Sequence, residues 1–228
     1  GLKDAVDRIC KEAEEAVDDN NNYIILTDRD ISENQAPIPS LMAVSAVHHH
    51  LINRRKRMQI DIVVESAEPR EVMHFALLFG YGASIINPYM SFAVIEKLVQ
   101  DKVIQQDFDK AQDNYIEALN KGLLKILSKM GISTLRSYRS AQIFEAVGIH
   151  SDVTNKYFEG TVSRIGGIGM EEIAEELLLP HRKAFTDDVH AMILTEGVYS
   201  YRKYGEKHAW NPESVALLQW STRKNDYQ

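Results

Sequence analysis

Apolar positions in the first 90 residues alternate between two spacings. In residues 2–17 they recur every three or four positions, which predicts a helix that ends near residues 18–22. Short apolar runs with β-branched residues then alternate with amphipathic stretches. Strands are predicted at residues 23–26, 58–65 and 83–87, and helices at 39–55 and from 68 to about 80–82. This alternation favours an α/β fold with parallel strands and right-handed crossovers.

The pattern continues with a longer helix. Apolar residues step by three or four from Phe108 to Met130, and Gly131 follows as a C-terminal cap. A fourth strand is predicted at residues 132–135, and a helix at 140–147 that Gly148 ends. Repeated βα units of this number predict either half of a β/α barrel or an open sheet of similar size.

Composition changes after Gly160. Residues 161–169 are rich in glycine and predict a turn, and residues 170–179 predict a helix that stops at Pro180. Beyond residue 189 the pattern indicates a tyrosine-rich strand or hairpin, a turn at Asn211-Pro212 and a short helix. We therefore divide the chain into an α/β domain at 1–160, a connector with its helix at 161–190, and a short C-terminal tail at 191–228.

Charge and cysteine content exclude several classes of protein. The 228 residues carry a net charge of −7, which disfavours nucleic-acid binding. The densest basic run, Arg54 to Arg57, is interpreted as a solvated helix end. Cys10 is the one cysteine, so the chain forms no internal disulfide and no cysteine-ligated cluster by itself. With no apolar run of about 18 residues and no signal peptide, we expect no membrane association and a cytoplasmic location.

Polar side chains follow each predicted strand and should share one edge of the sheet. The candidates at this edge are Asp28, Arg29, Glu65, Asn87, Arg136 and Arg139. Two interpretations stay open. The cluster could bind a polar ligand or transfer protons, or it could be an ion-pair network that ties loops together or docks another domain. We favour the second because no residue stands out as a nucleophile.

Other motifs carry no chemistry. The three consecutive histidines from His48 to His50 point about 100° apart on a helix, so they do not converge on one metal ion. Residues 164–169 resemble a phosphate-binding loop only superficially, because Glu171 and Glu172 follow in the first helical turn. No hydrolase, metalloprotease or nucleotide-binding motif is present. We therefore predict no catalytic, cofactor-binding or metal-binding residue.

Several blocks of sequence resemble the glutamate synthase large subunit. They are ILTDRD, NQAPIPSLMAVSAVHHHLI, VVESAEPREVMHFALLFGYGASIINPY, GLLKILSKMGISTLRSYRSAQIFEAVGI and YFEGTVSRIGGIGMEEIAEE, in the order of that family. The resemblance implies the C-terminal part of a central domain at 1–160, a connector, and at 191–228 the start of an FMN-binding domain. It further implies a parent enzyme that makes L-glutamate from glutamine-derived ammonia and 2-oxoglutarate, with FMN, a 3Fe–4S cluster and NADPH or ferredoxin.

The resemblance also implies partners. These are the glutaminase and FMN domains of the same polypeptide, and a small NADPH-oxidising subunit. Departures limit what this chain does alone. It begins at Gly1 rather than at a catalytic cysteine, Cys10 does not replace three cluster-ligating cysteines, and no family catalytic residue falls on a position here. Ser140 stands where the family pattern has glycine, which predicts a relaxed backbone contact in that turn.

Three hypotheses follow. The chain is a structural spacer that holds the glutaminase and flavin sites in register and helps to wall a passage for ammonia. Alternatively, it is a self-contained half-barrel enzyme or a binding protein for a small anionic metabolite. The third is an interaction subunit of a split synthase.

Overall fold

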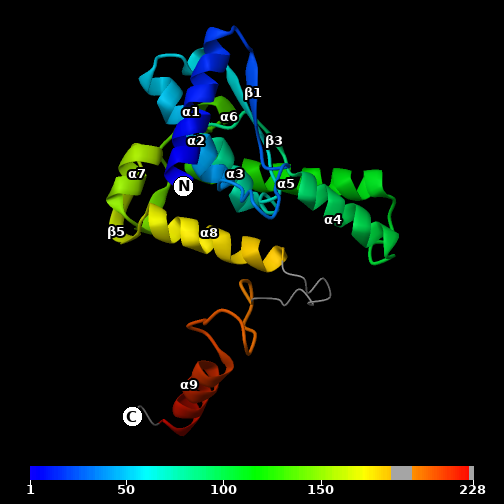
Figure 1. Cartoon of the computed structure of the whole chain (residues 1–228). Helices are drawn as coiled ribbons and strands as arrows, with labels where there is room; N and C mark the ends of the chain where they lie inside the picture. Colours follow the sequence, from blue (N-terminus) through cyan, green and yellow to red (C-terminus); the bar gives the residue numbers. More distant parts are fainter. Residues whose placement is uncertain (186–196, 226–228) are drawn as a thin grey trace. The chain divides into compact units, whose positions relative to one another are not determined.

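The computed structural model describes residues 1–185 and 197–225, in two compact units at residues 1–185 and 186–228. The first unit contains a parallel sheet in the order β1-β2-β3, formed by Tyr23–Thr27, Asp61–Glu65 and Ile85–Asn87 (Figure 1). A second, two-stranded parallel sheet joins β4 (Glu145–Ile149) to β5 (Val162–Ile168). No closed barrel forms in the described residues, so the open-sheet prediction is confirmed.

The core lies between the first sheet and two helices. Helices α1 (Leu2–Asp18) and α2 (Ser40–Asn53) cover one face of β1–β3 (Figure 1). Buried residues of the helices pack on alternate residues of the strands: Val6, Cys10, Val44, Val47, Ile62 and Val64. The period of two along each strand sends these side chains to one face, and the helical period collects their partners.

The remaining helices of the first unit follow the strands. They are α3 (Val72–Gly80), α4 (Tyr89–Gln100), α5 (Phe108–Met130), α6 (Leu135–Tyr138), α7 (Ser151–Tyr157) and α8 (Met170–Ala184), with a 3-10 turn at Arg57–Gln59. The predicted α5 and its cap are confirmed, because Gly131 adopts the left-handed conformation with φ of 69°. In the second unit, Asn211 caps α9 (Pro212–Lys224) with hydrogen bonds to Glu213 N and Ser214 N.

Several sequence-based predictions between residues 57 and 180 are wrong. The strand expected at 58–65 begins only at Asp61, after the 3-10 turn, and helix α4 was not predicted. Residues 135–138 form a helical turn instead of a fourth strand, and the helix expected at 140–147 is replaced by strand β4. The glycine-rich segment is strand β5, and α8 continues through Pro180. The tyrosine-rich strand or hairpin is absent from residues 197–211, while residues 190–196 lie outside the described part.

The expected relaxation at Ser140 does not occur. Ser140 adopts φ of 61°, a left-handed conformation that glycine reaches without cost. Its backbone N–H donates to Gly80 O at 2.9 Å, so the close contact of the turn is kept. The Ser140 hydroxyl also bonds to His48 Nε2, a contact that glycine could not make.

Helix α2 receives its N-terminal cap from a distant residue. Pro39, at the capping position, offers no side-chain hydrogen bond. Instead, Glu68 Oε2 accepts from Ser40 N at 2.8 Å and from Ser40 Oγ at 2.5 Å. A carboxylate at this end also complements the helix dipole.

We expect Glu68→Ala to lower the free energy of unfolding by about 1–2 kcal/mol, because it removes the cap of a buried helix. Urea denaturation followed by circular dichroism measures the change. Glu33→Ala, on the exposed loop after β1, serves as the control and should stay within about 0.5 kcal/mol of the parent chain. Equal effects of the two substitutions would contradict the capping role.

Candidate functional site: the carboxyl ends of the sheet

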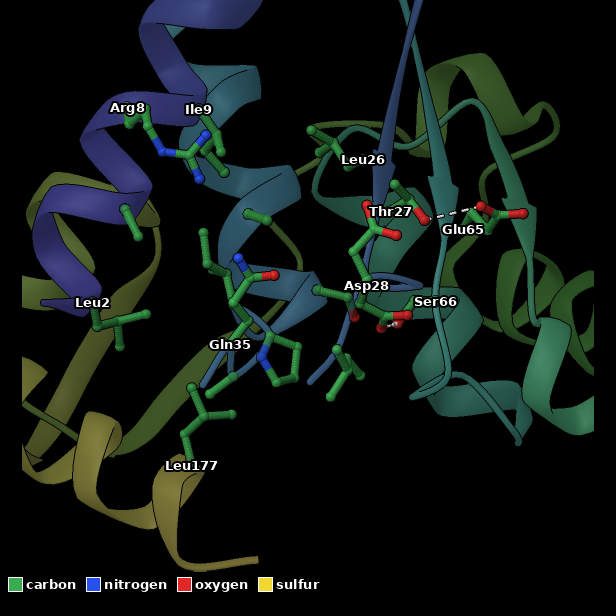
Figure 2. Close-up of a pocket in the computed structure, with 18 of the residues that line it drawn as sticks. Leu2, Arg8, Ile9, Leu26, Thr27, Asp28, Gln35, Glu65, Ser66 and Leu177 are labelled. Carbon is green, nitrogen blue, oxygen red and sulfur yellow. Dashed lines mark hydrogen bonds between the residues drawn. The ribbon is translucent and has the colours of Figure 1, made fainter. Parts of the chain in front are cut away.

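Glu65 is the centre of a polar cluster at the carboxyl end of β2. Its Oε2 accepts from Thr27 Oγ1 at 2.9 Å (Figure 2). Its Oε1 accepts from Arg29 Nε at 2.8 Å and from Asn87 Nδ2 at 3.1 Å. The Arg29 guanidinium, followed by the Thr27 hydroxyl, lowers the pKa of Glu65. A carboxylate that is ionised and occupied on both oxygens is poorly suited to accept a proton from a substrate.

Asp28 forms a second cluster beside the first. Its carboxylate accepts from Ser66 Oγ at 2.6 Å, from Ala67 N at 3.0 Å and from the Tyr89 hydroxyl at 2.7 Å. Burial, followed by the bond to Asp28, raises the pKa of Tyr89 to about 12, so this phenol stays a neutral donor. The Arg29 guanidinium lies 4.2 Å from the centre of the Tyr89 ring. These contacts tie the loops after β1 and β2 to the start of α4.

The other two predicted residues lie elsewhere. Arg139 Nη1 is 3.8 Å from Asp61 Oδ1, at the amino end of β2, and Arg136 is exposed on α6. Their expected position rested on a fourth strand at 132–135, which the chain does not form. The structure therefore brings together Asp28, Arg29, Glu65 and Asn87, and their docking role stays a prediction.

A cavity of about 870 Å³ lies next to these strand ends, lined by α1, β1, the following loop and α8 (Figure 2). The His181 ring bonds to Ser32 O at 2.8 Å and joins α8 to the loop. Most of the lining is apolar, as at Leu2, Ile9 and Leu177. The charged lining residues are Arg8, Glu12, Asp28, Asp30 and Glu65, and Arg8 pairs with Glu12 at 2.7 Å. This acidic excess suits an anionic ligand poorly.

Sequence reasoning missed a buried cluster around His48. Arg57 is only 8% exposed, and it donates to His48 Nδ1 at 2.8 Å, Ile60 O at 2.6 Å and Gly82 O at 2.8 Å. Because Nδ1 accepts, the neutral ring carries its proton on Nε2, which faces the Ser140 hydroxyl. A histidine that activates serine needs a free electron pair on that nitrogen. The His48–Ser140 pair is therefore structural.

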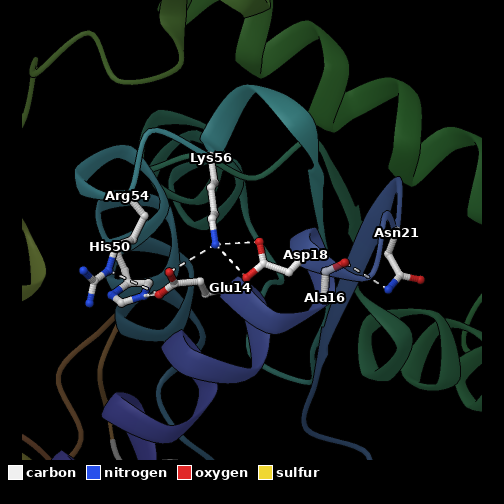
Figure 3. A network of polar contacts seen from close by, with 7 residues as sticks. All are labelled: Glu14, Ala16, Asp18, Asn21, His50, Arg54 and Lys56. Carbon is white, nitrogen blue, oxygen red and sulfur yellow. Dashed lines mark hydrogen bonds and ion pairs between the residues drawn. The ribbon is translucent and has the colours of Figure 1, made fainter.

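The basic run is only in part a solvated helix end, because Arg54 and Arg55 are exposed whereas Lys56 is half-buried and Arg57 is buried. Arg57 is buried, whereas Lys56 Nζ donates to Glu14 Oε1 at 3.2 Å and to Asp18 Oδ2 at 2.7 Å (Figure 3). Arg54 Nε lies 3.2 Å from Glu14 Oε2, which also bonds to His50 Nε2 at 2.9 Å (Figure 3). The bonds from His50 and then Lys56 lower the pKa of Glu14. The network joins the end of α2 to α1.

The three consecutive histidines have different partners. His48 contacts Arg57 and Ser140, His49 Nδ1 lies 2.8 Å from Ser45 O, and His50 bonds to Glu14. The three side chains therefore do not share one partner.

Within the described residues, no helix is long and apolar enough to cross a membrane.

Comparison with known families decides the affiliation of the chain. Residues 1–150 match the family described as the glutamate synthase central domain. This chain belongs to that family. The chain is 44% identical over 227 residues to the glutamate synthase [NADPH] large chain of Bacillus subtilis. The aligned region covers 100% of this chain and 15% of that protein.

Other relatives extend the comparison. The ferredoxin-dependent glutamate synthase of Pyropia yezoensis is 41% identical over 97% of this chain and 15% of its own length. For the glutamate synthase [NADH] of Schizosaccharomyces pombe the identity is 39%, over 99% of this chain and 11% of its own length. Their names show NADPH, NADH and ferredoxin as electron sources in the family. A flavocytochrome b2 structure with sulfite bound has a TM-score of 0.47 and 13% identity, over 64% of this chain and 37% of its own.

Proposed function

We propose that this chain is a structural part of a glutamate synthase, without activity of its own. The parent would form L-glutamate from glutamine-derived ammonia and 2-oxoglutarate, in the cytoplasm. The chain would hold the glutaminase and FMN sites of the same polypeptide in register and help to wall the passage of ammonia, and residues 191–228 would begin the FMN domain. A small NADPH-oxidising subunit would be a further partner.

The observation that carries this proposal is the pairing of the strand-end carboxylates. Glu65 and Asp28 together accept from five side chains and one backbone amide: Thr27, Arg29, Asn87, Ser66, Tyr89 and Ala67 N. Such clusters fix loops, and because donors already occupy both carboxylates, neither Glu65 nor Asp28 is free to attack or deprotonate a substrate. Membership of the glutamate synthase central-domain family supports the spacer role, because a central domain without catalytic residues would lie between the other domains of the synthase.

The cofactors of the parent do not fit the described residues. Cys10 is buried on α1, and burial raises the pKa of its thiol to about 11, whereas a 3Fe–4S cluster requires several thiolates. The cavity beside the sheet has four carboxylates and one arginine, an environment that repels the phosphate of FMN. We therefore assign FMN and the cluster to other parts of the parent. The same acidic lining disfavours the alternative of a binding protein for an anionic metabolite.

Glu65→Gln in the complete synthase tests the proposal. We expect more glutamine to be hydrolysed per glutamate formed, because the glutamine at position 65 keeps one acceptor oxygen but loses the charge and the second acceptor that hold the loops after β1, β2 and β3. The measurement compares the two product amounts in one reaction, with the melting temperature recorded alongside. Glu33→Gln is the control and should keep the ratio of the parent enzyme.

An unchanged ratio together with an unchanged melting temperature would contradict the role of Glu65. A purified 1–228 chain that showed flavin absorbance would contradict the absence of a cofactor. If the synthase assembled from separately encoded subunits, the chain would be an interaction subunit, and the same ratio could be measured on the assembly.

A further inference from the structure

In the described residues 1–185, the first sheet has one face that no helix covers. Strand register places Tyr23, Ile25, Val63 and Ile85 on this side, opposite the residues that pack on α1 and α2. Tyr23 is 62% exposed, Ile25 55% and Ile85 58%. We call this side, formed by Tyr23, Ile25, Val63 and Ile85, the open sheet face. Parallel sheets are almost always covered on both faces, so this apolar surface indicates an interface.

Strand order identifies what kind of element would cover the open sheet face. The order β1-β2-β3 follows the sequence without reversal, and right-handed crossovers then place the connecting helices on the same side. Doubly wound sheets reverse their order and carry helices on both faces, whereas barrels keep it and enclose the other face with more strands. Among the residues that the structure describes, β1 and β3 are both edge strands, so each has an edge open for pairing.

The ends of the open sheet face are polar. Thr27, Glu65 and Asn87 lie at the carboxyl end on the same side of the strands, and their side chains bond to one another. At the amino end, Asp61 accepts from Ser84 Oγ at 2.6 Å and has Arg139 within 3.8 Å. An apolar centre between polar ends is the usual composition of a protein interface.

We propose that the open sheet face is closed by further β-strands of the synthase polypeptide, from outside residues 1–228. The argument rests on the proposed function, and on the length of the relatives, of which this chain covers 11–15%. Two copies of the chain would together contribute six strands, three from each copy, whereas a closed β/α barrel needs about eight. The longer synthase polypeptide has ample length to supply the remaining strands.

Thiol labelling tests the interface. Ile25→Cys places a thiol on the open sheet face, and Leu124→Cys places one on α5, where Leu124 is 66% exposed. Each variant is prepared in the 1–228 chain and in the complete synthase, and labelled briefly with a maleimide. Peptide mass spectrometry then gives the labelling rate at each position. The buried Cys10 reports unfolding in the same spectrum, because it is labelled only when the fold opens.

We expect the thiol at position 25 to react at least about tenfold more slowly in the synthase than in the 1–228 chain, and the thiol at position 124 to react equally in both. Equal rates for position 25 would overturn the interface, while leaving the family and the Glu65 test untouched. Protection of position 25 in the 1–228 chain itself, with a doubled mass in size-exclusion chromatography, would also overturn it, because the occupant would then be a second copy.

Discussion

Arg57→Ala is expected to lower the free energy of unfolding by about 3–5 kcal/mol, the largest effect of any substitution in the basic run. The side chain makes three buried hydrogen bonds, to His48 Nδ1, Ile60 O and Gly82 O. Its removal leaves three buried acceptors without a donor and opens a space between α2 and the start of β2. Urea denaturation at neutral pH, followed by circular dichroism, measures the loss.

Arg54→Ala is the matched control because it removes the same charge from the same run. Arg54 is 58% exposed and pairs with Glu14 on the surface, so its loss should cost no more than about 1 kcal/mol. Arg57→Lys, which keeps the charge without the planar fork, should fall between the two. If Arg57→Ala and Arg54→Ala had equal effects, the buried cluster would not stabilise the fold.

The second large effect is a dependence of stability on pH that arises from His48. Burial, followed by the nearby Arg57 charge, lowers the pKa of His48 from 6.5 to about 3. In the unfolded chain the ring binds a proton below its ordinary pKa, so the unfolded state takes up more protons between pH 6.5 and 3. The contribution of His48 to the free energy of unfolding is therefore fully present above pH 6.5 and decreases as the pH falls. The expected decrease is about 2 kcal/mol between pH 7 and 5.

His48→Gln should flatten this dependence, because glutamine has no titrating group and still offers an acceptor to Arg57. The measurement is the free energy of unfolding at intervals from pH 7 to 5, above the range in which most carboxylates titrate. Asn34→Ala, an exposed substitution that removes no titrating group, should keep the slope of the parent chain. A parent and a His48→Gln chain with the same slope would show that His48 is protonated in the folded protein.

Much of residues 1–131 could be predicted from local signals. Alternating apolar positions and β-branched residues identify β1 and β3. The helical spacing that starts at Phe108 and the cap at Gly131 predict both ends of α5 correctly. The clustering of Asp28, Glu65 and Asn87 also follows from sequence, because parallel strands bring their carboxyl ends to one edge. These features depend on neighbours in the chain or on a general rule of topology.

Residues 132–168 could not be predicted in this way. Strand β5 contains Gly166 and Gly167, which have low strand propensity, and Gly167 lies so close to the Gly148 carbonyl that a side chain would clash. Its strand identity depends on pairing with β4, a contact between segments that each appear non-extended alone. The His48–Arg57–Ser140 cluster depends likewise on a distant turn, to which neither the histidine run nor the basic run points.

The open sheet face places two opposed selection pressures on the same few codons. Directed evolution of the 1–228 chain for solubility would replace Tyr23, Ile25 and Ile85 with polar residues, because these are the large apolar side chains that the first sheet exposes to water. Selection on the complete synthase would retain them. A library screened first for solubility and then for activity in the parent would thus separate the residues that the fold requires from those that assembly requires.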